Sequence, residues 1–421
     1  MRERELTPDL RGDACEQLND GGGVPSARGR WGAKYVCGME TGTDRPAGAA
    51  PAGAPAVLIL VTSHLTGRGG RESVIRQVLA ELGRVPGRAG LAMLDHVDDR
   101  NWEHSLPGPV YVAGIEANGA LRTHLPAVLR FVRRVIAEFR PDAVLVTEPL
   151  AAPLVRMAAW FHRGAGPAVL SWLHVDPRKV RFGWALRCVD GHLGISAGVL
   201  HHLPPPVGGK PAYVVYNPVE LDGVGVLPRG RKGAAVPLLF VGRLEEHKGV
   251  DRILEALGRI AARNWVLHVL GDGTESGALR RQADMLGIDS RIIWHGWAAD
   301  PWGVVPEASL LLLASRTEGF PVVLLEAMAR GIPVLAMDCP FGPSEIVVPG
   351  RNGWLVPAGD VQGMAEKVDA ICSGRCALPT HNDVRITADR FAPDVVARRI
   401  SMAVQDAQRR RQSRSAARAG G

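Results

Sequence analysis

Residues 310–338, LLLLASRTEGFPVVLLEAMARGIPVLAMD, contain the strand–helix–strand pattern from which the fold can be predicted. The apolar run at 310–315 fits a short buried strand, and 333–338 is a second run of the same kind. Between them, 321–330 has the length of a helix, and Pro321 suits the first helical position. Strands that alternate with helices in this way are typical of a parallel sheet.

The same alternation extends in both directions from this stretch. The expected strands are 56–61, 143–147, 168–174, 192–196 and 213–219 in the first half, and 238–244, 265–271, 291–296 and 353–357 in the second. A Gly-, Pro- and Arg-rich stretch at 221–236 interrupts the pattern and is interpreted as a linker. We therefore predict an α/β protein with two Rossmann-like, doubly wound parallel-sheet domains facing across a cleft.

The predicted domains are residues 56–220 and 237–385. Residues 386–408 are expected to form a C-terminal helix that packs back towards the first domain, followed by a basic tail at 409–421. Residues 1–55 have no sustained apolar periodicity and are predicted to be a disordered extension.

Composition is that of a globular protein, with 46% apolar and 22% charged residues in 421 positions. No apolar run approaches the roughly 18 residues that a membrane-spanning helix needs. The charged first ten residues do not resemble a signal peptide. The six cysteines are scattered and are interpreted as reduced thiols. We therefore expect a cytoplasmic protein.

The net charge is +7, but the tail alone contributes five arginines and no acid, which leaves +2 for the other residues. Such a distribution suits an anionic membrane surface or a phosphorylated substrate as well as nucleic acid, and it also suits a solvated, frayed chain end. A nucleic-acid-binding protein is disfavoured because no helix-turn-helix or RNP-like motif is present. A nicotinamide-dependent oxidoreductase is disfavoured because the chain lacks a strict G-x-G-x-x-G followed by an acid about 20 residues later.

Five loops of the second half are rich in glycine and polar residues. They follow successive expected strands and lie at 242–249, 271–273, 295–297, 318–321 and 342–345. In open parallel sheets, ligands bind beyond the carboxyl ends of the strands. We therefore expect these loops to form a ligand site at one sheet edge.

Arg243 and Lys248 flank the start of one helix, and an Arg fork with a point-charge Lys suits a diphosphate. The alternative is a pair of ordinary surface cations. Pro321 at a helix start would leave the N–H groups of Gly319 and Phe320 free to bind an anion.

Glu318 and Glu326, eight residues apart, could hold two hydroxyl-bearing rings of one long ligand, although helices are rich in glutamate. No D-x-D pair is present, so a leaving diphosphate is expected to be neutralised without a metal ion.

The first half has weaker signals. Gly69 and Gly70 lie in a G-R-G-G loop before a helix, which resembles a phosphate cradle but departs from G-x-G-x-x-G because Glu72 takes the place of the last glycine. His174 ends an expected strand and faces the predicted cleft, although a lone histidine is more often structural. Glu148 has the equivalent position after 143–147, and both a structural role and a contact with an acceptor remain open for it.

Together these residues resemble the retaining glycosyltransferases of family 4, which have the two-domain GT-B fold. The resemblance extends from about Ala56 to the last helix. It is carried most specifically by VGRLEEHKG (241–249), GDG (271–273), EGFPVVLLE (318–326), GPSEIV (342–347) and GRNGWLV (350–356).

The resemblance implies roles for individual residues. Arg243 and Lys248 would hold the donor diphosphate, which Gly69 and Gly70 would approach from the first domain. Glu318 would bind hydroxyls of the transferred sugar and Glu326 the ribose. His174 would lie near the reacting carbon. Gly319, Phe320 and Pro321 would complete the donor site.

Within the family, SWLH (171–174), YVVYNPV (213–219) and WHGW (294–297) are similar to lipopolysaccharide-core galactosyltransferases that use UDP-galactose and form a 1,6 linkage. This similarity implies a hexosyltransferase that uses UDP-galactose first and UDP-glucose second, with a glycolipid or oligosaccharide acceptor. The alternative within the fold is a GDP-mannose-dependent α-mannosyltransferase. We expect no cofactor, no metal ion and no nucleic-acid partner. We do expect peripheral contact with the inner face of an anionic membrane.

Overall fold

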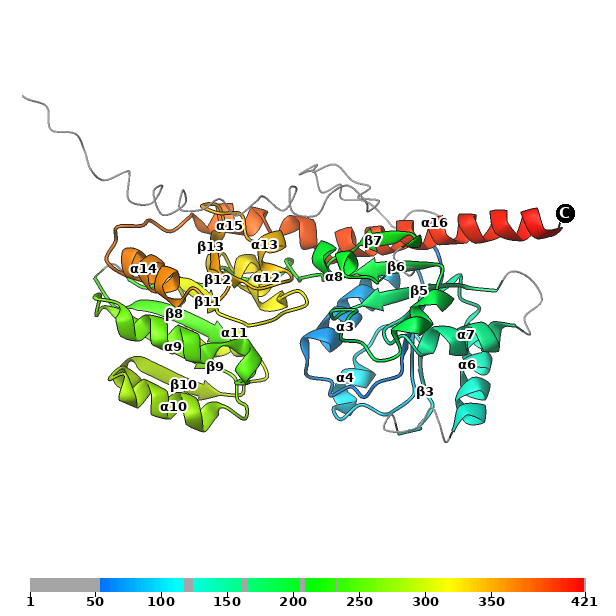
Figure 1. Cartoon of the computed structure of the whole chain (residues 1–421), viewed down its shortest axis with the longest axis horizontal. Coiled ribbons are helices and arrows are strands. Elements are labelled where there is room, and N and C mark those ends of the chain that lie inside the picture. The colour runs from blue at the N-terminus through cyan, green and yellow to red at the C-terminus, as the bar shows by residue number, and fades with distance from the viewer. Residues whose placement is uncertain (1–53, 117–123, 161–165, 205–208, 232, 420–421) are drawn as a thin grey trace, which may run out of the picture. The chain divides into compact units, whose positions relative to one another are not determined.

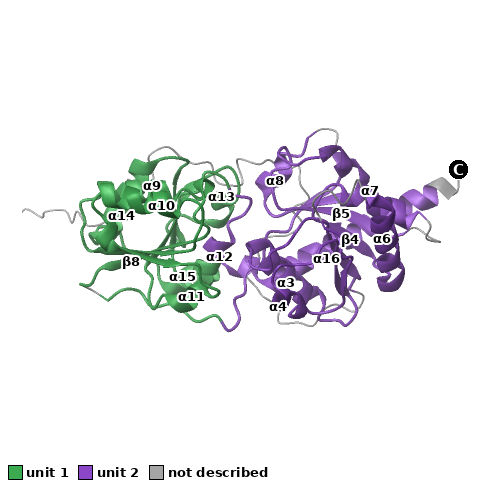
Figure 2. Cartoon of the chain, turned by 90° about the horizontal axis from the view of Figure 1, so that it is seen from below, with its two compact units in different colours: residues 1–32, 224–317, 326–387 green, residues 33–223, 318–325, 388–421 purple. Residues whose placement is uncertain are grey.

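The computed structural model describes residues 54–116, 124–160, 166–204, 209–231 and 233–419. The predicted disordered extension, apart from its last two residues, therefore lies outside the described residues. The chain forms two compact units, which Figure 2 shows in separate colours. The C-terminal unit comprises Val224–Thr317 and Glu326–Thr387. The N-terminal unit comprises the described residues of 54–223 together with Glu318–Leu325 and residues 388–419.

The N-terminal unit contains a seven-stranded sheet in the order β3-β2-β1-β4-β5-β6-β7, and all of its pairings are parallel (Figure 1). Its strands are β1 (Val57–Val61), β2 (Ala89–Met93), β3 (Val110–Val112), β4 (Ala143–Val146), β5 (Ala168–Leu173), β6 (Gly191–Gly194) and β7 (Ala212–Val214). Its helices are α3 (Gly70–Leu82), α4 (Arg100–His104), α6 (Leu125–Phe139), α7 (Ala151–Ala159), η1 (Gly183–Cys188), α8 (Ala197–His201), η5 (Asp389–Phe391) and α16 (Pro393–Ala419).

The C-terminal unit contains a six-stranded parallel sheet in the order β10-β9-β8-β11-β12-β13. Its strands are β8 (Val236–Val241), β9 (Trp265–Leu270), β10 (Ile292–Gly296), β11 (Leu310–Leu313), β12 (Val334–Asp338) and β13 (Gly353–Pro357). Its helices are η3 (Glu246–Lys248), α9 (Val250–Arg259), α10 (Ser276–Met285), η4 (Asp289–Arg291), α11 (Pro301–Val304), α13 (Pro343–Ile346), α14 (Val361–Cys372) and α15 (His381–Ile386). Helix α12 (Val322–Ala329) begins in the N-terminal unit and ends here.

The apolar spacing of the helices explains the cores. In α6, Val128, Val132, Val135 and Ile136 are buried, at the i, i+3, i+4 spacing of one helix face. In the C-terminal unit, Ile253, Leu254 and Leu257 of α9 pack against the same core as β8 and β9. The predicted α/β class with two parallel-sheet domains is confirmed.

The last helix differs from the prediction. We expected it to end at 408 and to be followed by a basic tail, but α16 continues to Ala419. Arg409 and Arg410 form ion pairs with Asp406, and Arg411 pairs with Asp190. Part of the apparent tail charge is therefore neutralised within the N-terminal unit.

Among the described residues, none of the helices combines the length and the apolar character needed to cross a membrane. Cys188, Cys339, Cys372 and Cys376 are free thiols, while Cys15 and Cys37 lie outside the described residues.

Candidate functional site

The carboxyl ends of the strands in the C-terminal unit lie at one sheet edge because every pairing is parallel. The loops after β8, β9, β10 and β12 therefore share this edge, as expected from the sequence. The fifth predicted loop, at 318–321, follows β11 in sequence but packs with the N-terminal unit. The structure thus divides the predicted site residues between the two units.

Two glycine-containing loops at the carboxyl edge of the C-terminal sheet are in contact through their backbones. A Cβ placed on Gly271, whose φ is +137°, would lie 1.8 Å from the carbonyl oxygen of Gly242. The backbone N–H of Leu244 donates to the carbonyl of Asp272 at 2.9 Å, and Glu275 donates back to Leu244 at 2.9 Å. The GDG motif is therefore required by the close approach of the loop after β8.

Arg243 and Lys248 both belong to this loop. The Arg243 side chain is 70% exposed and forms an ion pair with Glu245. Lys248 ends η3 immediately before Gly249, which has a left-handed φ of +68°. A Cβ on Gly249 would lie 2.0 Å from the carbonyl oxygen of Ala314, so this turn is pressed against the end of β11.

Arg316 fixes the same turn from the β11 side. Its guanidinium donates to both carboxylate oxygens of Asp251, at 2.8 and 2.7 Å, and to the carbonyl of Glu246 at 2.7 Å. Its backbone N–H donates to the carbonyl of His247 at 2.8 Å. Sequence reasoning missed Arg316, although its position directly after the β11 run was a usable signal.

Glu326 lies on α12, where burial raises the pKa of its carboxyl and Arg330 and Trp302 lower it. The indole N–H of Trp302 donates to Glu326 Oε2 at 3.3 Å. Helix α12 begins at Val322, one residue later than predicted, and the carbonyl of Pro321 accepts from Leu324 at 3.1 Å.

In the N-terminal unit, Gly319 packs against the end of β5. A Cβ at Gly319 would lie 2.5 Å from the carbonyl oxygen of His174 and 3.2 Å from Ile195 Cδ1. Gly319 and His174, two residues to which the resemblance gives places in the donor site, are thus adjacent although they are 145 positions apart. Phe320 is buried beside Tyr216 and Phe391, with ring centroids 5.3 and 5.6 Å away. The phenyl ring of Phe320 therefore serves packing, and the donor-binding role of its backbone N–H stays a prediction.

His174 is uncharged at neutral pH. Burial, with a smaller effect from the Arg71 guanidinium, lowers the pKa of His174 to about 3. Its Nε2 is buried and has no hydrogen-bond partner among the described residues. A neutral imidazole can donate or accept a hydrogen bond, so this ring nitrogen suits a sugar hydroxyl.

Glu148 lies where the strand order of the N-terminal sheet reverses, between β1 and β4. Its Oε2 accepts from the Thr62 backbone N–H (2.8 Å), the Thr62 hydroxyl (3.1 Å) and the Thr147 hydroxyl (2.7 Å). Its Oε1 accepts from Ser63 (2.5 Å) and Arg71 (3.1 Å). Of the two roles left open for Glu148, this network favours the structural one.

Gly69 and Gly70 differ in their surroundings. A Cβ on Gly69 would lie 2.5 Å from Glu72 Oε2, whereas a Cβ on Gly70 would meet nothing within 4 Å. The buried Glu72 carboxylate accepts a hydrogen bond from the backbone N–H of Thr66 at 3.0 Å. The departure from G-x-G-x-x-G at position 72 thus has a local reason, because this carboxylate shapes the loop. The donor-binding role of both glycines stays a prediction.

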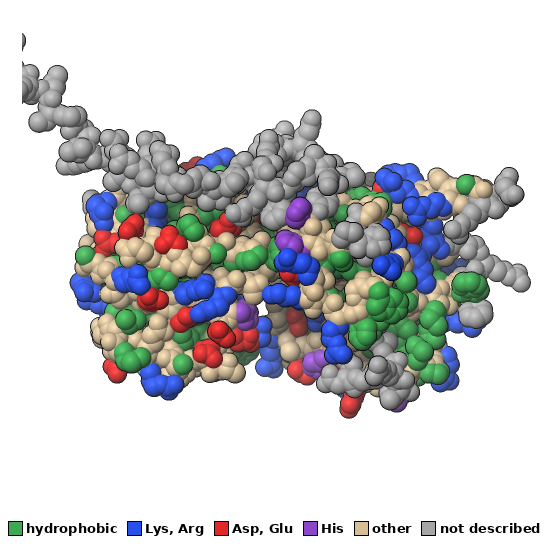
Figure 3. Space-filling model, viewed as in Figure 1, with side chains coloured by type: hydrophobic (Ala, Val, Ile, Leu, Met, Phe, Trp, Pro, Cys, Tyr) green, Lys and Arg blue, Asp and Glu red, His purple; other side chains and the backbone are tan. Residues whose placement is uncertain are grey.

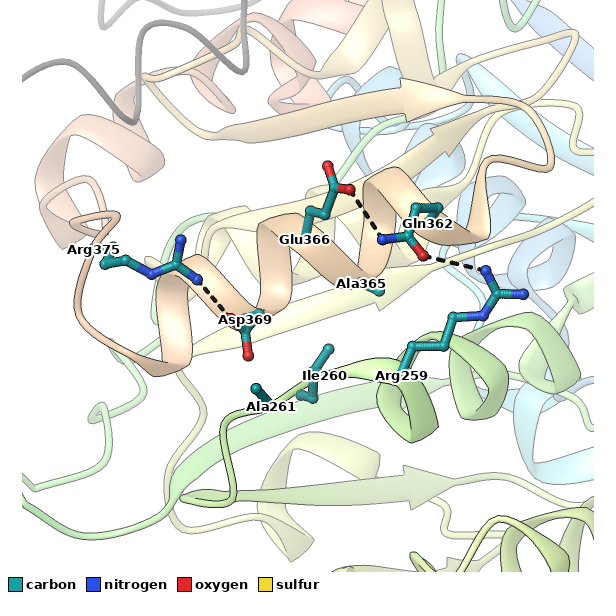
Figure 4. A pocket seen from close by; sticks show the side chains of 8 residues that line it. All are labelled: Arg259, Ile260, Ala261, Gln362, Ala365, Glu366, Asp369 and Arg375. Atoms are coloured by element: carbon teal, nitrogen blue, oxygen red, sulfur yellow. Dashed lines mark hydrogen bonds and ion pairs between the residues drawn. The ribbon is translucent and has the colours of Figure 1, made fainter.

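The described residues also line a cavity of about 350 Å³ between α9 and α14 (Figure 4). Its lining residues Arg259 and Ile260 lie at the end of α9, at the sheet edge opposite the predicted loops. Figure 4 shows its polar groups pairing with one another, including Arg375 with Asp369 and Arg259 with Gln362. This cavity is therefore not the predicted donor site. Within the described ranges, there is no group of three or more His, Cys, Asp or Glu side chains placed to hold a metal ion.

Comparison with known proteins identifies the class to which this fold and these loops belong. Residues 236–373 match the family described as glycosyl transferases group 1. The lipopolysaccharide 1,6-galactosyltransferase of Escherichia coli is 30% identical over 344 residues, which cover 79% of this chain and 94% of that protein. The enzyme of the same name from Salmonella typhimurium is 34% identical over 263 residues, covering 61% of this chain and 72% of that protein.

The solved structure of a lipopolysaccharide outer core galactosyltransferase, WaaB, is 26% identical. It superimposes with a TM-score of 0.70 and covers 83% of this chain and 99% of that one. The chain therefore belongs to the group 1 glycosyl transferases. It is a glycosyltransferase with the GT-B fold.

Proposed function

We propose that this glycosyltransferase moves a hexose from a UDP-sugar, galactose before glucose, to a lipopolysaccharide core or a similar glycolipid. The observation that carries the proposal is the loop after β8, which places Arg243 and Lys248 at the carboxyl edge of the sheet and is held there by backbone contacts. An Arg fork and a Lys point charge suit a diphosphate. The choice of donor and acceptor is supported by the 30% identity over 94% of the E. coli galactosyltransferase.

The proposed reaction retains configuration at the sugar carbon. The bond from that carbon to the diphosphate oxygen breaks as the acceptor hydroxyl attacks from the same face, and the departing phosphate oxygen accepts the hydroxyl proton. Arg243 and Lys248 stabilise the developing negative charge. Glu318 and neutral His174 orient the sugar, and Glu326 holds the ribose.

A donor panel tests this proposal. Radiolabelled UDP-galactose, UDP-glucose and GDP-mannose are incubated with the full chain and a lipopolysaccharide acceptor that lacks the terminal galactose, with and without EDTA. We expect transfer from UDP-galactose that survives the chelator. Turnover of GDP-mannose alone would overturn the donor assignment, and complete inhibition by EDTA would overturn the metal-free account.

The proposed acceptor is anchored in a membrane, and the N-terminal unit has a surface suited to approach it. Five large apolar side chains are exposed on α7 and the residue that follows it, on η1, and on the segment that precedes η1. They are Met157, Trp160, Val175, Phe182 and Trp184. Trp160 is 84% exposed and Trp184 57%, and α7 and η1 pack against each other. Figure 3 shows hydrophobic side chains gathered on this part of the molecule.

Cations surround these apolar side chains. Lys179 and Arg181 are exposed in the segment before η1, and α6, which packs on α7, exposes Arg130, Arg133 and Arg134. Aromatic side chains with adjacent cations are typical of surfaces that lie at a membrane interface. Each cation near an anionic bilayer contributes about 1 kcal/mol. We therefore propose peripheral association of the enzyme with the cytoplasmic face of an anionic membrane.

Co-sedimentation with anionic liposomes checks this association. We expect the wild type to bind at low salt and to dissociate as salt rises, and Trp160→Ser with Trp184→Ser to reduce binding at least several-fold. Lys179→Ala with Arg181→Ala should reduce it further. Arg178 is left intact because it forms an ion pair with the buried Asp176 carboxylate at 2.8 Å. The control is Met285→Ser, an equally exposed apolar residue of the C-terminal unit. If the wild type does not co-sediment with anionic vesicles at low salt, the proposed membrane association is excluded.

A further inference from the structure

Trp302 lies on the short helix α11 with its indole directed at a residue of the donor site. Asp300 caps this helix by accepting from the backbone N–H of Trp302 at 3.1 Å, and Pro301 occupies its first turn. The Trp302 side chain is only 9% exposed. Its single polar atom, Nε1, donates to Glu326 Oε2 at 3.3 Å. A buried indole N–H and a partly buried carboxylate thus pair with each other.

Arg330 contacts both members of the pair formed by Trp302 and Glu326. Its guanidinium carbon lies 4.4 Å from the centroid of the Trp302 ring, within the range of a cation–π contact. Its Nη1 also donates to the backbone carbonyl of Glu326 at 3.0 Å. Arg330 therefore stacks on the indole and is tied to the helix turn that carries Glu326. The indole cannot rotate away from the carboxylate without breaking this stack.

The contacts leave one oxygen of Glu326 available. Among the described residues, Trp302 is the side chain that donates to the carboxylate, and it does so at Oε2. Oε1 has no hydrogen-bond partner among the described residues, and it is not fully buried. A glutamate side chain has three rotatable bonds and loses conformational entropy when it is fixed. A donor that holds Oε2 fixes these bonds before any ligand arrives and so presents Oε1 in one direction.

We propose that Trp302 is a positioning residue that holds the Glu326 carboxylate so that Oε1 faces the ribose of the nucleotide. This inference rests on the proposed function, in which Glu326 binds the ribose hydroxyls. In this role Trp302 acts through the Glu326 carboxylate and not by contacting the donor. Preorganisation of this kind lowers the entropic cost of binding. Loss of this preorganisation should therefore weaken nucleotide binding, and only for nucleotides that carry the ribose hydroxyls.

The test compares UDP with 2′,3′-dideoxy-UDP by calorimetry on the full chain. We expect the wild type to prefer UDP because only UDP offers hydroxyls to Glu326. Trp302→Phe keeps a ring under Arg330 and removes the N–H. It should weaken UDP binding about 5- to 10-fold, the cost of fixing one freed glutamate side chain when the ribose binds, and leave the binding of dideoxy-UDP nearly unchanged. If Trp302 had only a structural role, Trp302→Phe would weaken the binding of both nucleotides equally.

Trp294→Phe is a matched control. The Trp294 indole also donates to a carboxylate, Asp289 Oδ1 at 3.1 Å, and also lies beneath an arginine, Arg280 at 4.9 Å. Asp289 belongs to η4, at the amino end of β10, so this change should alter stability without changing the preference for ribose.

A double-mutant cycle separates the remaining outcomes. If Trp302 acts through Glu326, adding Trp302→Phe to Glu326→Ala, which removes the acceptor of the indole N–H, should cost no further UDP affinity. A wild type that does not discriminate UDP from dideoxy-UDP would refute the ribose role of Glu326, which belongs to the proposed function. Clear discrimination by the wild type that Trp302→Phe fully retains would refute the positioning role and leave the proposed function standing.

Discussion

Replacing Arg243 or Lys248 with alanine is expected to lower kcat/KM about 30- to 1,000-fold. Each cation is proposed to face the diphosphate on which negative charge develops, and loss of a preorganised electrostatic donor costs about 2–4 kcal/mol in the transition state. Both residues belong to a loop whose backbone is fixed by contacts, so the loop backbone needs little reorganisation when the donor binds. Steady-state kinetics at varied UDP-sugar concentration measure the effect.

Stability should change little in either variant, because Arg243 is largely exposed and its ion pair with Glu245 is a surface pair. The control is Arg263→Ala, an exposed arginine just before β9, at the opposite edge of the same sheet. Near-normal turnover in both site variants, or an equal loss in the control, would contradict the assignment of the diphosphate to this loop.

The C-terminal unit was the more predictable half of the fold. Its strands are continuous apolar runs such as 310–313, and their ends match the structure to within two residues except in β8, which ends at 241 instead of the predicted 244. In the N-terminal unit, β2 and β3 were missed. β2 is AGLAM, without a β-branched or aromatic residue, and β3 has three residues. Gly90 of β2 is present because the Phe139 ring lies over it, 2.9 Å from where a Cβ would stand.

The extent of α16 was predictable in part. Residues 404–419 contain Ala, Gln and Arg, which favour helix, so the sequence already carried a signal against a frayed tail. The contacts that hold this helix in place could not be predicted from the sequence. Tyr213 donates to Asp406, a contact between residues 193 positions apart. No local pattern encodes such a pairing.

The same distinction applies to the site. The loops at the carboxyl edge were predictable because parallel strands place their ends together. The contacts that hold the loops were not, since they join distant residues: Arg316 with Asp251, Glu148 with Thr62, and Trp302 with Glu326. Sequence motifs therefore predicted the donor residues, whereas the contacts that orient these residues emerged only from the fold.

Replacing Gly249 with alanine is expected to lower kcat/KM about 100-fold while leaving every proposed donor ligand in the sequence. The new Cβ would lie 2.0 Å from the carbonyl oxygen of Ala314, which is backbone at the end of β11 and cannot move aside as a side chain would. The turn must therefore shift, and Lys248 shifts with it. A displacement of about 1 Å at a catalytic group can cost 10²-fold in rate. Kinetics with UDP-galactose, together with a melting curve, check the prediction.

The appropriate control is Gly287→Ala. Gly287 has nearly the same left-handed φ, +66° against +68°, but nothing lies within 4 Å of its Cβ position. Both variants incur the left-handed strain of about 1–2 kcal/mol, so a similar small fall in melting temperature is expected from that source. Only Gly249→Ala should also lose activity and stability through the clash with β11. Equal kinetics in the two variants would mean that the close approach to Ala314 does not position Lys248, and that the lysine acts from a flexible segment instead.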